Sequence, residues 1–237
     1  MIIGKEEEII AKKAVKFINK NKEMIIVRFA DLSDFIPDEF PITIFMAGSP
    51  GAGKTEFSKD LVEAFKNRPV RIDADDLREI FEEYNGANAH VFQKAVSIGV
   101  DILYRHCLKN NLNVVLDGTF AHRRVEENIQ RSLDLERSVE IYFVYQKPKI
   151  AWNFTQKREM VEHRRITKEA FIKTFLGARD NVNMVKRRFG DRIMLNLLIK
   201  DITNLRVKKK FIDIKREEVD SYLGRIYNYQ HLNKMIK

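Results

Sequence analysis

The clearest chemical signal in the sequence is one glycine-rich segment. It reads Gly48-Ser49-Pro50-Gly51-Ala52-Gly53-Lys54-Thr55. A glycine, four residues and then Gly-Lys-Thr form the pattern in which backbone N–H groups surround phosphate oxygens. Lys54 is placed to neutralise the β- and γ-phosphates, and the Thr55 hydroxyl to reach Mg²⁺. A ligand-free turn is the alternative, but an apolar strand-like run precedes the segment and an amphipathic helix follows it. The segment therefore predicts binding of ATP and Mg²⁺, without naming a reaction.

Acidic residues follow two further predicted strands. Asp73-Ala74-Asp75-Asp76 comes directly after residues 70–72, and Asp117 ends the run 113–116 before Gly118-Thr119. The carboxyl ends of parallel strands meet at one sheet edge, so these carboxylates should lie beside the phosphate-binding loop. One aspartate of the first group suffices to cap the next helix, which leaves the others available for catalysis. Asp117-Gly118 also suits an ordinary turn, although its position favours orienting Mg²⁺.

Basic residues gather further along the chain, in 156–159 and 163–165. If this stretch is one helix, the spacing of seven places Arg158 and Arg165 on the same face. Guanidinium groups bind phosphate oxygens bidentately and stabilise the charge of a moving phosphoryl group. A solvated surface helix explains the same residues equally well. The residues alone leave both interpretations open.

Short apolar runs alternate with helical patterns, and these elements must position the residues above. Strands are expected at 42–47, 70–72, 113–116 and 139–145, an apolar run at 193–199, and a short strand at 211–214; helices are expected at 6–19, 54–65, 77–84, 91–108, 125–135, within 150–188, and from about residue 217. Alternation of this kind implies parallel strands with helices on both faces. We therefore expect an α/β fold of three layers.

Composition excludes several classes of protein. The chain has 237 residues, of which 44% are hydrophobic and only 10 are Gly and 5 Pro, so a folded core is expected rather than disorder. Its one cysteine, Cys107, has no partner for an intrachain disulfide. The sequence shows neither a signal-peptide pattern nor a membrane-length apolar run. We expect a cytoplasmic protein without a membrane association.

The net charge of +9 is unevenly distributed. Residues 136–237 carry 24 basic and 12 acidic side chains, whereas the two preceding parts are slightly acidic. Part of this excess lies in Lys208-Lys209-Lys210, which would suit a nucleic-acid track. The segment lacks regularly interleaved aromatic residues for base stacking, so nucleic-acid binding is disfavoured but stays open.

The motifs together resemble those of the zeta toxin family of P-loop kinases. The resemblance covers about residues 41–200 and rests on the phosphate-binding loop, Ile72-Asp-Ala-Asp75, Leu116-Asp-Gly-Thr119, and the stretches Arg158-Glu159 and Arg165-Ile-Thr167. It implies a P-loop kinase fold, with a mostly parallel sheet flanked by helices and an arginine-bearing helical lid. It further implies phosphorylation of a sugar-nucleotide hydroxyl such as the 3′-hydroxyl of UDP-N-acetylglucosamine, and an antitoxin as possible partner.

The resemblance also suggests roles for individual residues. Asp75 would be the base, Asp117 and Thr119 would hold the substrate, with Asp117 also near the metal, and Arg158 and Arg165 would clamp phosphates. Two departures stand out. The family typically has Glu where this chain has Asp117, and the short interval between the arginines leaves Arg164 and Arg165 as rivals for the second clamp.

On this basis we expect a single kinase domain over residues 1–237. It comprises an N-terminal helical extension (1–40), a core (41–200) with a lid at about 150–190, and a C-terminal strand and helix (201–237). The expected reaction is γ-phosphoryl transfer from ATP to a hydroxyl of a small phosphorylated metabolite. The alternatives are a polynucleotide or other small-molecule kinase, and a nucleotide-dependent regulatory ATPase that phosphorylates no second substrate.

Overall fold

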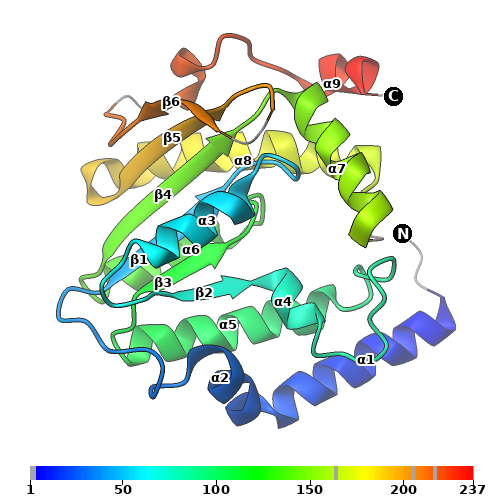
Figure 1. Cartoon of the computed structure of the whole chain (residues 1–237), viewed down its shortest axis with the longest axis vertical. Helices are drawn as coiled ribbons and strands as arrows, with labels where there is room; N and C mark the ends of the chain where they lie inside the picture. The colour runs from blue at the N-terminus through cyan, green and yellow to red at the C-terminus, as the bar shows by residue number, and fades with distance from the viewer. Residues whose placement is uncertain (1–3, 163–164, 204–205, 216–217, 237) are drawn as a thin grey trace.

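The computed structural model describes residues 4–162, 165–203, 206–215 and 218–236. At its centre is a six-stranded sheet with the order β2-β3-β1-β4-β5-β6 (Figure 1). The strands are β1 Ile42–Ala47, β2 Val70–Asp73, β3 Val114–Asp117, β4 Ser138–Tyr145, β5 Met194–Lys200 and β6 Val207–Phe211. All neighbouring pairs are parallel except β5 and β6. The expected α/β class with a mostly parallel sheet is confirmed.

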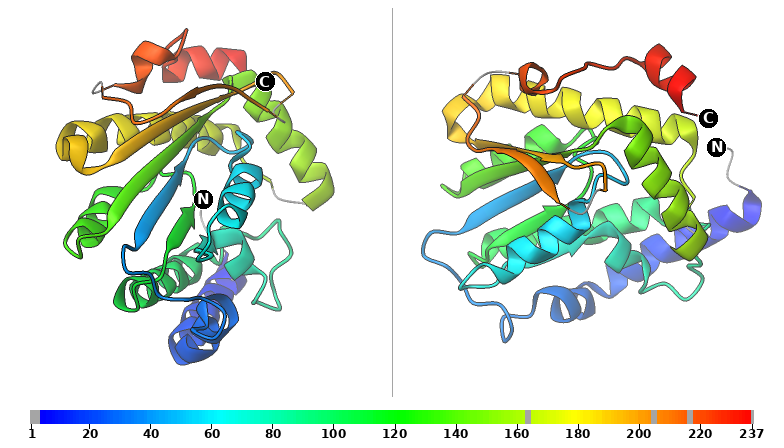
Figure 2. Two further views of the ribbon diagram at one scale, coloured as in Figure 1. Left: turned by 60° about the vertical axis from the view of Figure 1, so that its left-hand side comes forward. Right: turned by 45° about the horizontal axis from the view of Figure 1, so that its top comes forward.

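Helices cover both faces of this sheet, which gives three layers (Figure 2). On one face, α3 Lys54–Glu63 packs on a small apolar cluster that includes Ile44, Met46 and Val115. On the other face, the larger cluster gathers residues of α5 Gln93–Lys109, α6 Val125–Leu133 and α8 Lys168–Phe189. The central strands are nearly continuous apolar runs because both of their faces are buried.

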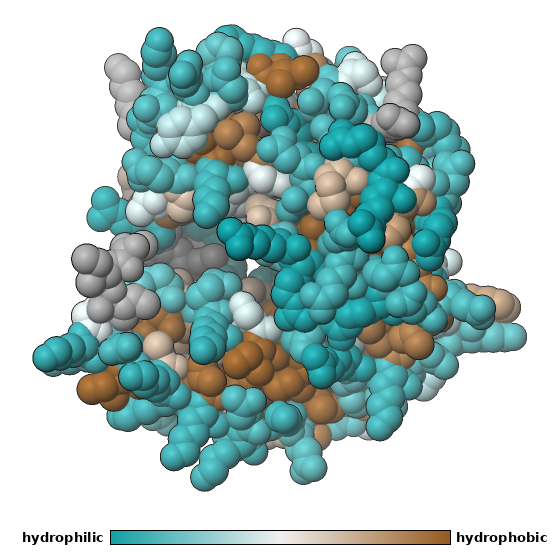
Figure 3. All heavy atoms as spheres, turned by 180° about the vertical axis from the view of Figure 1, so that it is seen from behind, coloured by the Kyte–Doolittle hydropathy of each residue, from teal (hydrophilic) through white to brown (hydrophobic). Residues whose placement is uncertain are grey.

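The N-terminal residues form two helices that pack on the core. Helices α1 Lys5–Lys20 and α2 Lys22–Ala30 bury Ile18 and Ile25 fully and lie against α5. Seen from behind, hydrophobic atoms form a band across the lower part of the molecule, on the side where these helices pack (Figure 3). The N-terminal helices therefore bury part of their apolar surface on α5, while Ile9, Phe17 and Val27 stay exposed.

The C-terminal residues complete the far side of the sheet. The 3-10 turns Gly190–Arg192 and Val219–Tyr222 flank β5 and β6, and α9 Tyr229–Met235 buries Leu232 beside Phe171 and Phe175 of α8. Lys208, Lys209 and Lys210 lie on β6 at the sheet edge, and all three are exposed. Lysines on an edge strand discourage pairing with another chain, which gives this run a structural explanation.

Several expected elements differ from the structure. The helix expected at 77–84 is instead α4 Ala74–Arg78, which starts directly after β2 and is followed by turns and loop. The strand expected at 211–214 lies earlier, at β6, and the helix expected from about residue 217 is limited to α9 after a 3-10 turn. Helix α2 was also not predicted, because nine residues are too few to show a clear helical spacing of apolar side chains.

Candidate active site

The phosphate-binding loop joins β1 to α3 at the carboxyl edge of the sheet. Gly48, Gly51 and Gly53 all have positive φ values, of 139°, 70° and 81°. A Cβ atom on Gly48 would lie 2.3 Å from the Val144 carbonyl oxygen, and one on Gly51 would lie 2.2 Å from that of Ala151. Only glycine allows both the conformation and the close approach. The loop therefore leads into α3 in the shape needed to present backbone N–H groups to an anion.

The other loop residues lie where the motif requires them. Ser49 and Ala52 are buried and form a turn, in which the Ala52 N–H donates to the Ser49 carbonyl at 3.2 Å. Pro50 and Thr55 are half-buried. The Gly48 N–H donates to the carbonyl of Thr119 at 3.2 Å, so the loop is tied to the segment that follows β3.

Lys54 folds back over the loop. Its Nζ donates to the carbonyl oxygens of Gly48 and Ser49 at 3.1 and 2.8 Å. Removal of the ammonium group from water lowers the pKa of Lys54 to about 8, although Asp117 and Asp73 favour its charged form. The two carbonyl oxygens hold the Lys54 ammonium beside the loop. The phosphate oxygens of a nucleotide would replace them as its hydrogen-bond acceptors.

Four charged groups meet at the ends of β2 and β3. Asp73 and Asp117 are register partners on these strands, and Arg71 points to the same face of the sheet. The Arg71 guanidinium is ion-paired with Asp73, with Asp117 at 2.7 Å and with Asp76 at 2.9 Å. Burial, together with the neighbouring carboxylates Asp75 and Asp117, raises the pKa of Asp73 to about 6. Arg71 thus stabilises a group of carboxylates that would otherwise repel one another.

Asp75 is held by a second arginine. The Asp73 carboxylate caps α4 by accepting the Asp75 N–H at 2.9 Å, which leaves the Asp75 side chain free of capping. Arg78 Nη1 donates to Asp75 Oδ1 at 2.6 Å, and its Nη2 donates to Gln93 at 2.7 Å. Because Arg78 is buried and Gln93 lies on α5, the orientation of Asp75 is fixed by two helices.

Asp73, Asp75 and Asp76 line a polar cavity of about 370 Å³. Its lining includes Thr55 at the start of α3, Asp73 and Asp75 after β2, and Arg158 from α7 Pro148–Glu162. The structure thus brings the phosphate-binding loop, the proposed base and one of the two predicted arginines together. Such a space is suited to the phosphate groups of a nucleotide between a loop and an arginine.

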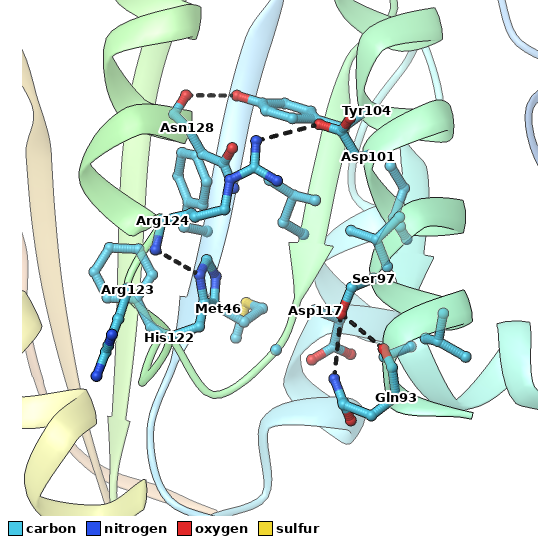
Figure 4. Close-up of a pocket in the computed structure, with 18 residues that line it drawn as sticks. Met46, Gln93, Ser97, Asp101, Tyr104, Asp117, His122, Arg123, Arg124 and Asn128 are labelled. Carbon is cyan, nitrogen blue, oxygen red and sulfur yellow. Dashed lines mark hydrogen bonds and ion pairs between the residues drawn. The ribbon is translucent and has the colours of Figure 1, made fainter. Parts of the chain in front are cut away.

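A second cavity of about 390 Å³ adjoins Asp117 on the other side (Figure 4). Its lining is mostly apolar, with Met46, Leu116 and Phe120, and it also includes Asp101 of α5 and His122, Arg123 and Arg124 of the segment before α6. Figure 4 shows Arg124 reaching toward Asp101, at 3.9 Å. Thr119, expected beside the substrate, is half-buried and does not line this cavity.

Arg165 does not share a helix face with Arg158, so that prediction is wrong. Helix α7 ends at Glu162, and Arg165 lies in the connection before α8. Its side chain is 77% exposed and its Nε lies 3.9 Å from Glu159 Oε1. The rival clamp residue, Arg164, lies outside the described residues. Of the two described arginines, Arg158 lines the polar cavity and Arg165 does not.

The residues expected to hold Mg²⁺ fit that ion when it arrives with a nucleotide. All hydrogen bonds to Asp117 that the described residues make end on Oδ2, from Ser58 at 2.5 Å and from Arg71. The described residues contain no group of three metal-binding side chains around one point. Mg²⁺ commonly binds through one or two carboxylates together with substrate phosphates, so Thr55 and Asp117 are a suitable protein contribution.

Sequence reasoning missed three residues that organise this site. Arg71, Arg78 and Ser58 hold Asp117, Asp75 and the start of α3 together. A signal for Arg71 was present, because a charged residue in a short strand directly before an aspartate cluster needs a partner nearby. Arg78 three residues after Asp75 on a helix is likewise a recognisable ion-pair spacing.

Fold and site together define a nucleotide-binding protein of the P-loop kinase class. The sequence matches the zeta toxin family over residues 28–216, which is most of the chain. The chain belongs to the zeta toxin family. No curated protein is recognisably similar to it in sequence.

Solved structures share this fold at low sequence identity. A structure from the PezAT chromosomal toxin-antitoxin system of Streptococcus pneumoniae superposes with a TM-score of 0.66 at 14% identity, covering 92% of this chain and 91% of the other. AvrRxo1-ORF1:-ORF2 with ATP gives a TM-score of 0.59 at 14% identity, over 85% of this chain and 65% of that one. The Pnkp1/Rnl/Hen1 RNA repair complex gives 0.52 at 18% identity, over 76% and 51%. The present chain thus spans about two thirds or less of the last two.

No described helix is long and apolar enough to cross a membrane.

Proposed function

We propose that this protein transfers the γ-phosphoryl group of ATP to a hydroxyl of a small phosphorylated metabolite, a sugar nucleotide such as UDP-N-acetylglucosamine. The observation that carries the proposal is the polar cavity that Thr55, Asp75 and Arg158 all line. A phosphate-binding loop explains nucleotide binding, but an oriented aspartate opposite it implies a second substrate with a proton to lose.

In this proposal each residue has a distinct task. The glycine-rich loop and Lys54 bind the phosphates of ATP, and Thr55 and Asp117 would hold Mg²⁺, which would supply positive charge to offset that of the phosphates. Asp75 accepts the proton of the attacking hydroxyl, and Arg158 stabilises the charge on the phosphoryl group. Arg165 stays a proposed second clamp of the phosphates.

The acceptor would occupy the cavity between α5 and the loop before α6. The cavity is adjacent to Asp117, has a mostly apolar lining for a flat or weakly polar group, and includes Arg123 and Arg124 as cations for an anionic group. That combination suits a nucleotide better than a simple sugar. A shorter acid than the family's usual Glu at position 117 leaves more room at the base of this cavity.

The known structure from a toxin-antitoxin system supports a further part of the proposal. We propose that an antitoxin protein binds this chain when its activity must be suppressed. The N-terminal helices α1 and α2 are packed on α5 within the chain, so they act as part of the kinase rather than as a detachable inhibitor. The proposed reaction needs neither a membrane nor a nucleic acid, and a polynucleotide acceptor stays the alternative.

Labelled ATP and a metabolite extract test the proposal directly. The wild-type protein should label a small molecule, which mass spectrometry identifies, whereas Lys54→Ala and Asp75→Asn should label none. Asp75→Asn should retain ATP binding, because the side chain lies beyond the phosphate-binding loop. Transfer of label to RNA but to no metabolite would contradict the proposal, and so would full activity of Asp75→Asn. ATP hydrolysis unaffected by any acceptor would favour a regulatory ATPase.

A further inference from the structure

The segment 118–124, between β3 and α6, connects the phosphate-binding loop with the cavity proposed for the acceptor. The carbonyl oxygen of Thr119 accepts the Gly48 N–H at 3.2 Å. Further along the segment, Phe120, Arg123 and Arg124 belong to the lining of the acceptor cavity (Figure 4). The course of these few residues therefore determines both the shape of the cavity and its contact with the phosphate-binding loop.

The backbone of this segment turns at Phe120. Its φ of 62° lies in the left-handed region, which a bulky residue adopts only when the surrounding structure imposes it. The aromatic ring is buried and packs edge-on against Phe45 of β1, with the ring centres 5.8 Å apart. Packing of this kind fixes the ring, but the carbonyl groups around the turn need hydrogen-bond partners of their own.

One side chain of α8 supplies those partners. Asn181 Nδ2 donates to the carbonyl oxygen of Phe120 at 2.8 Å and to that of His122 at 3.1 Å. An amide nitrogen carries two hydrogens, so both are used on this turn. Four residues earlier on the same helix, a Cβ atom on Gly177 would lie 3.4 Å from that of Ala121. Helix α8 therefore lies directly against the segment and binds it through Asn181.

We propose that Asn181 is a positioning residue for the acceptor side of the site. By binding two carbonyl groups of the turn, it keeps Phe120 in its left-handed conformation and holds Arg123 and Arg124 at the cavity. Asn181 itself lines neither the acceptor cavity nor the polar cavity. The phosphate-binding loop depends on it less, because the loop is also held by the contacts of Lys54. This inference rests on the proposed function, in which the acceptor occupies that cavity.

Removal of the amide should loosen the segment and weaken recognition of the acceptor. In Asn181→Ala two carbonyl groups lose their donor, so the opened form of the segment should be populated about tenfold more. The KM for the acceptor should rise about tenfold, whereas kcat should change by less than about twofold. The dissociation constant of a non-hydrolysable ATP analogue should likewise stay within about twofold of the wild-type value.

The matched control is Asn183→Ala on the same helix. Asn183 also binds the backbone through its side chain, since its Oδ1 accepts the Val219 N–H at 2.8 Å. It lines neither cavity and does not contact the segment through this bond. Its substitution therefore removes a comparable hydrogen bond from α8, with an expected cost to stability but none to the acceptor cavity.

Trypsin digestion and steady-state kinetics together test the inference. Trypsin cleaves after arginine in locally opened chain, so the rate of cleavage after Arg123 and Arg124, followed by mass spectrometry, measures opening of the segment without any acceptor. The KM and kcat are measured with the metabolite that the wild-type protein labels. Circular dichroism establishes that each variant is folded. If Asn181→Ala is not, Asn181→Asp replaces it, because aspartate keeps the shape of the side chain but has no N–H to donate.

Faster cleavage and a raised KM in the Asn181 variant, with neither change in Asn183→Ala, support the inference. Unchanged cleavage in the Asn181 variant overturns it, and so does a KM that stays at the wild-type value or rises equally in the control. A wild-type protein that labels no metabolite contradicts the proposed function instead, and the cleavage rates then decide the inference alone.

Discussion

The arginines on the two sides of the proposed site differ in how they are held. On the sheet side, Arg71 and Arg78 are enclosed, and each is bound to carboxylates at hydrogen-bond distance. On the helical side, Arg158 and Arg165 are exposed, and the ion pair of Arg165 with Glu159 is a long one of 3.9 Å. The first pair is therefore held by carboxylates at short distance, whereas the second pair lies at the surface, where an incoming phosphate would be a stronger partner.

The enclosed arginines should therefore matter mainly for folding stability, and the exposed arginines mainly for activity. A buried arginine whose carboxylate partner is left behind costs folding free energy, because one charge then lacks compensation. An exposed arginine contributes little to folding but gains a strong partner when phosphate arrives. Substitutions on the two sides should therefore have opposite signatures, and the predictions below test that contrast.

Of the substitutions predicted below, Arg78→Met should have the largest effect on folding. This change leaves Asp75 and Gln93 without the donor that joins them, and we expect a loss of about 3 to 5 kcal/mol in unfolding free energy. Denaturant unfolding monitored by circular dichroism measures it. Arg105→Met is the control, because the ion pair of Arg105 with Asp101 at 2.9 Å is 69% exposed on the arginine side and should contribute only about 0.5 kcal/mol. Equal losses in the two variants would remove the contrast between enclosed and exposed arginines.

Arg158→Ala should show the opposite signature. The side chain lines the polar cavity yet is exposed, so unfolding free energy should change by less than about 0.5 kcal/mol. The rate of phosphoryl transfer should fall by about a hundredfold, because the transferred group loses a stabilising charge. The control is Lys157→Ala on the same helix, whose ammonium group lies 5.4 Å from the Phe154 ring and outside the cavity lining. A similar loss of transfer rate in both variants would show that the general charge of α7 matters, and not Arg158.

Local sequence patterns account for the parts of the fold and of the site that could be predicted. The phosphate-binding loop, the α/β class and the gathering of Asp73, Asp75 and Asp117 followed from local patterns and from the rule that parallel strands end at one edge. The alternation of apolar strands with amphipathic helices carries that information in short windows of sequence. Tertiary geometry was not needed for it.

Predictions that depended on long-range contacts were less successful. The helix expected at 77–84 ended early, since α4 is fixed by the Asp73 cap and by the contact of Arg78 with α5 rather than by its own length. The shared face of Arg158 and Arg165 required α7 to continue past Glu162, and helical periodicity gives no information on where a polar helix stops. The partners of Arg71 come from three different elements, which no local pattern joins.

The smallest predicted effect concerns Lys54, which combines both kinds of behaviour. It is held by two carbonyl oxygens before the ligand binds. Burial lowers its pKa to about 8, however, so it is only partly protonated near that pH. Phosphate oxygens raise that pKa in the complex. Below pH 8 the group is charged in both states, and ATP affinity should not depend on it. Above pH 8 the free protein must take up a proton on binding, so affinity weakens by about tenfold per pH unit.

Between pH 7.5 and 9.5 the dissociation constant of a non-hydrolysable ATP analogue with Mg²⁺ should therefore rise roughly twentyfold, as measured by calorimetric titration. Lys54→Arg is the matched variant, because guanidinium stays charged throughout this range and its profile should be flat. A flat profile for the wild type as well would mean that the Lys54 ammonium is charged in the free protein up to pH 9.5. The carbonyl oxygens of Gly48 and Ser49 and the neighbouring carboxylates would then stabilise the charged form of Lys54. They would do so as firmly as the carboxylates that hold Arg71 and Arg78.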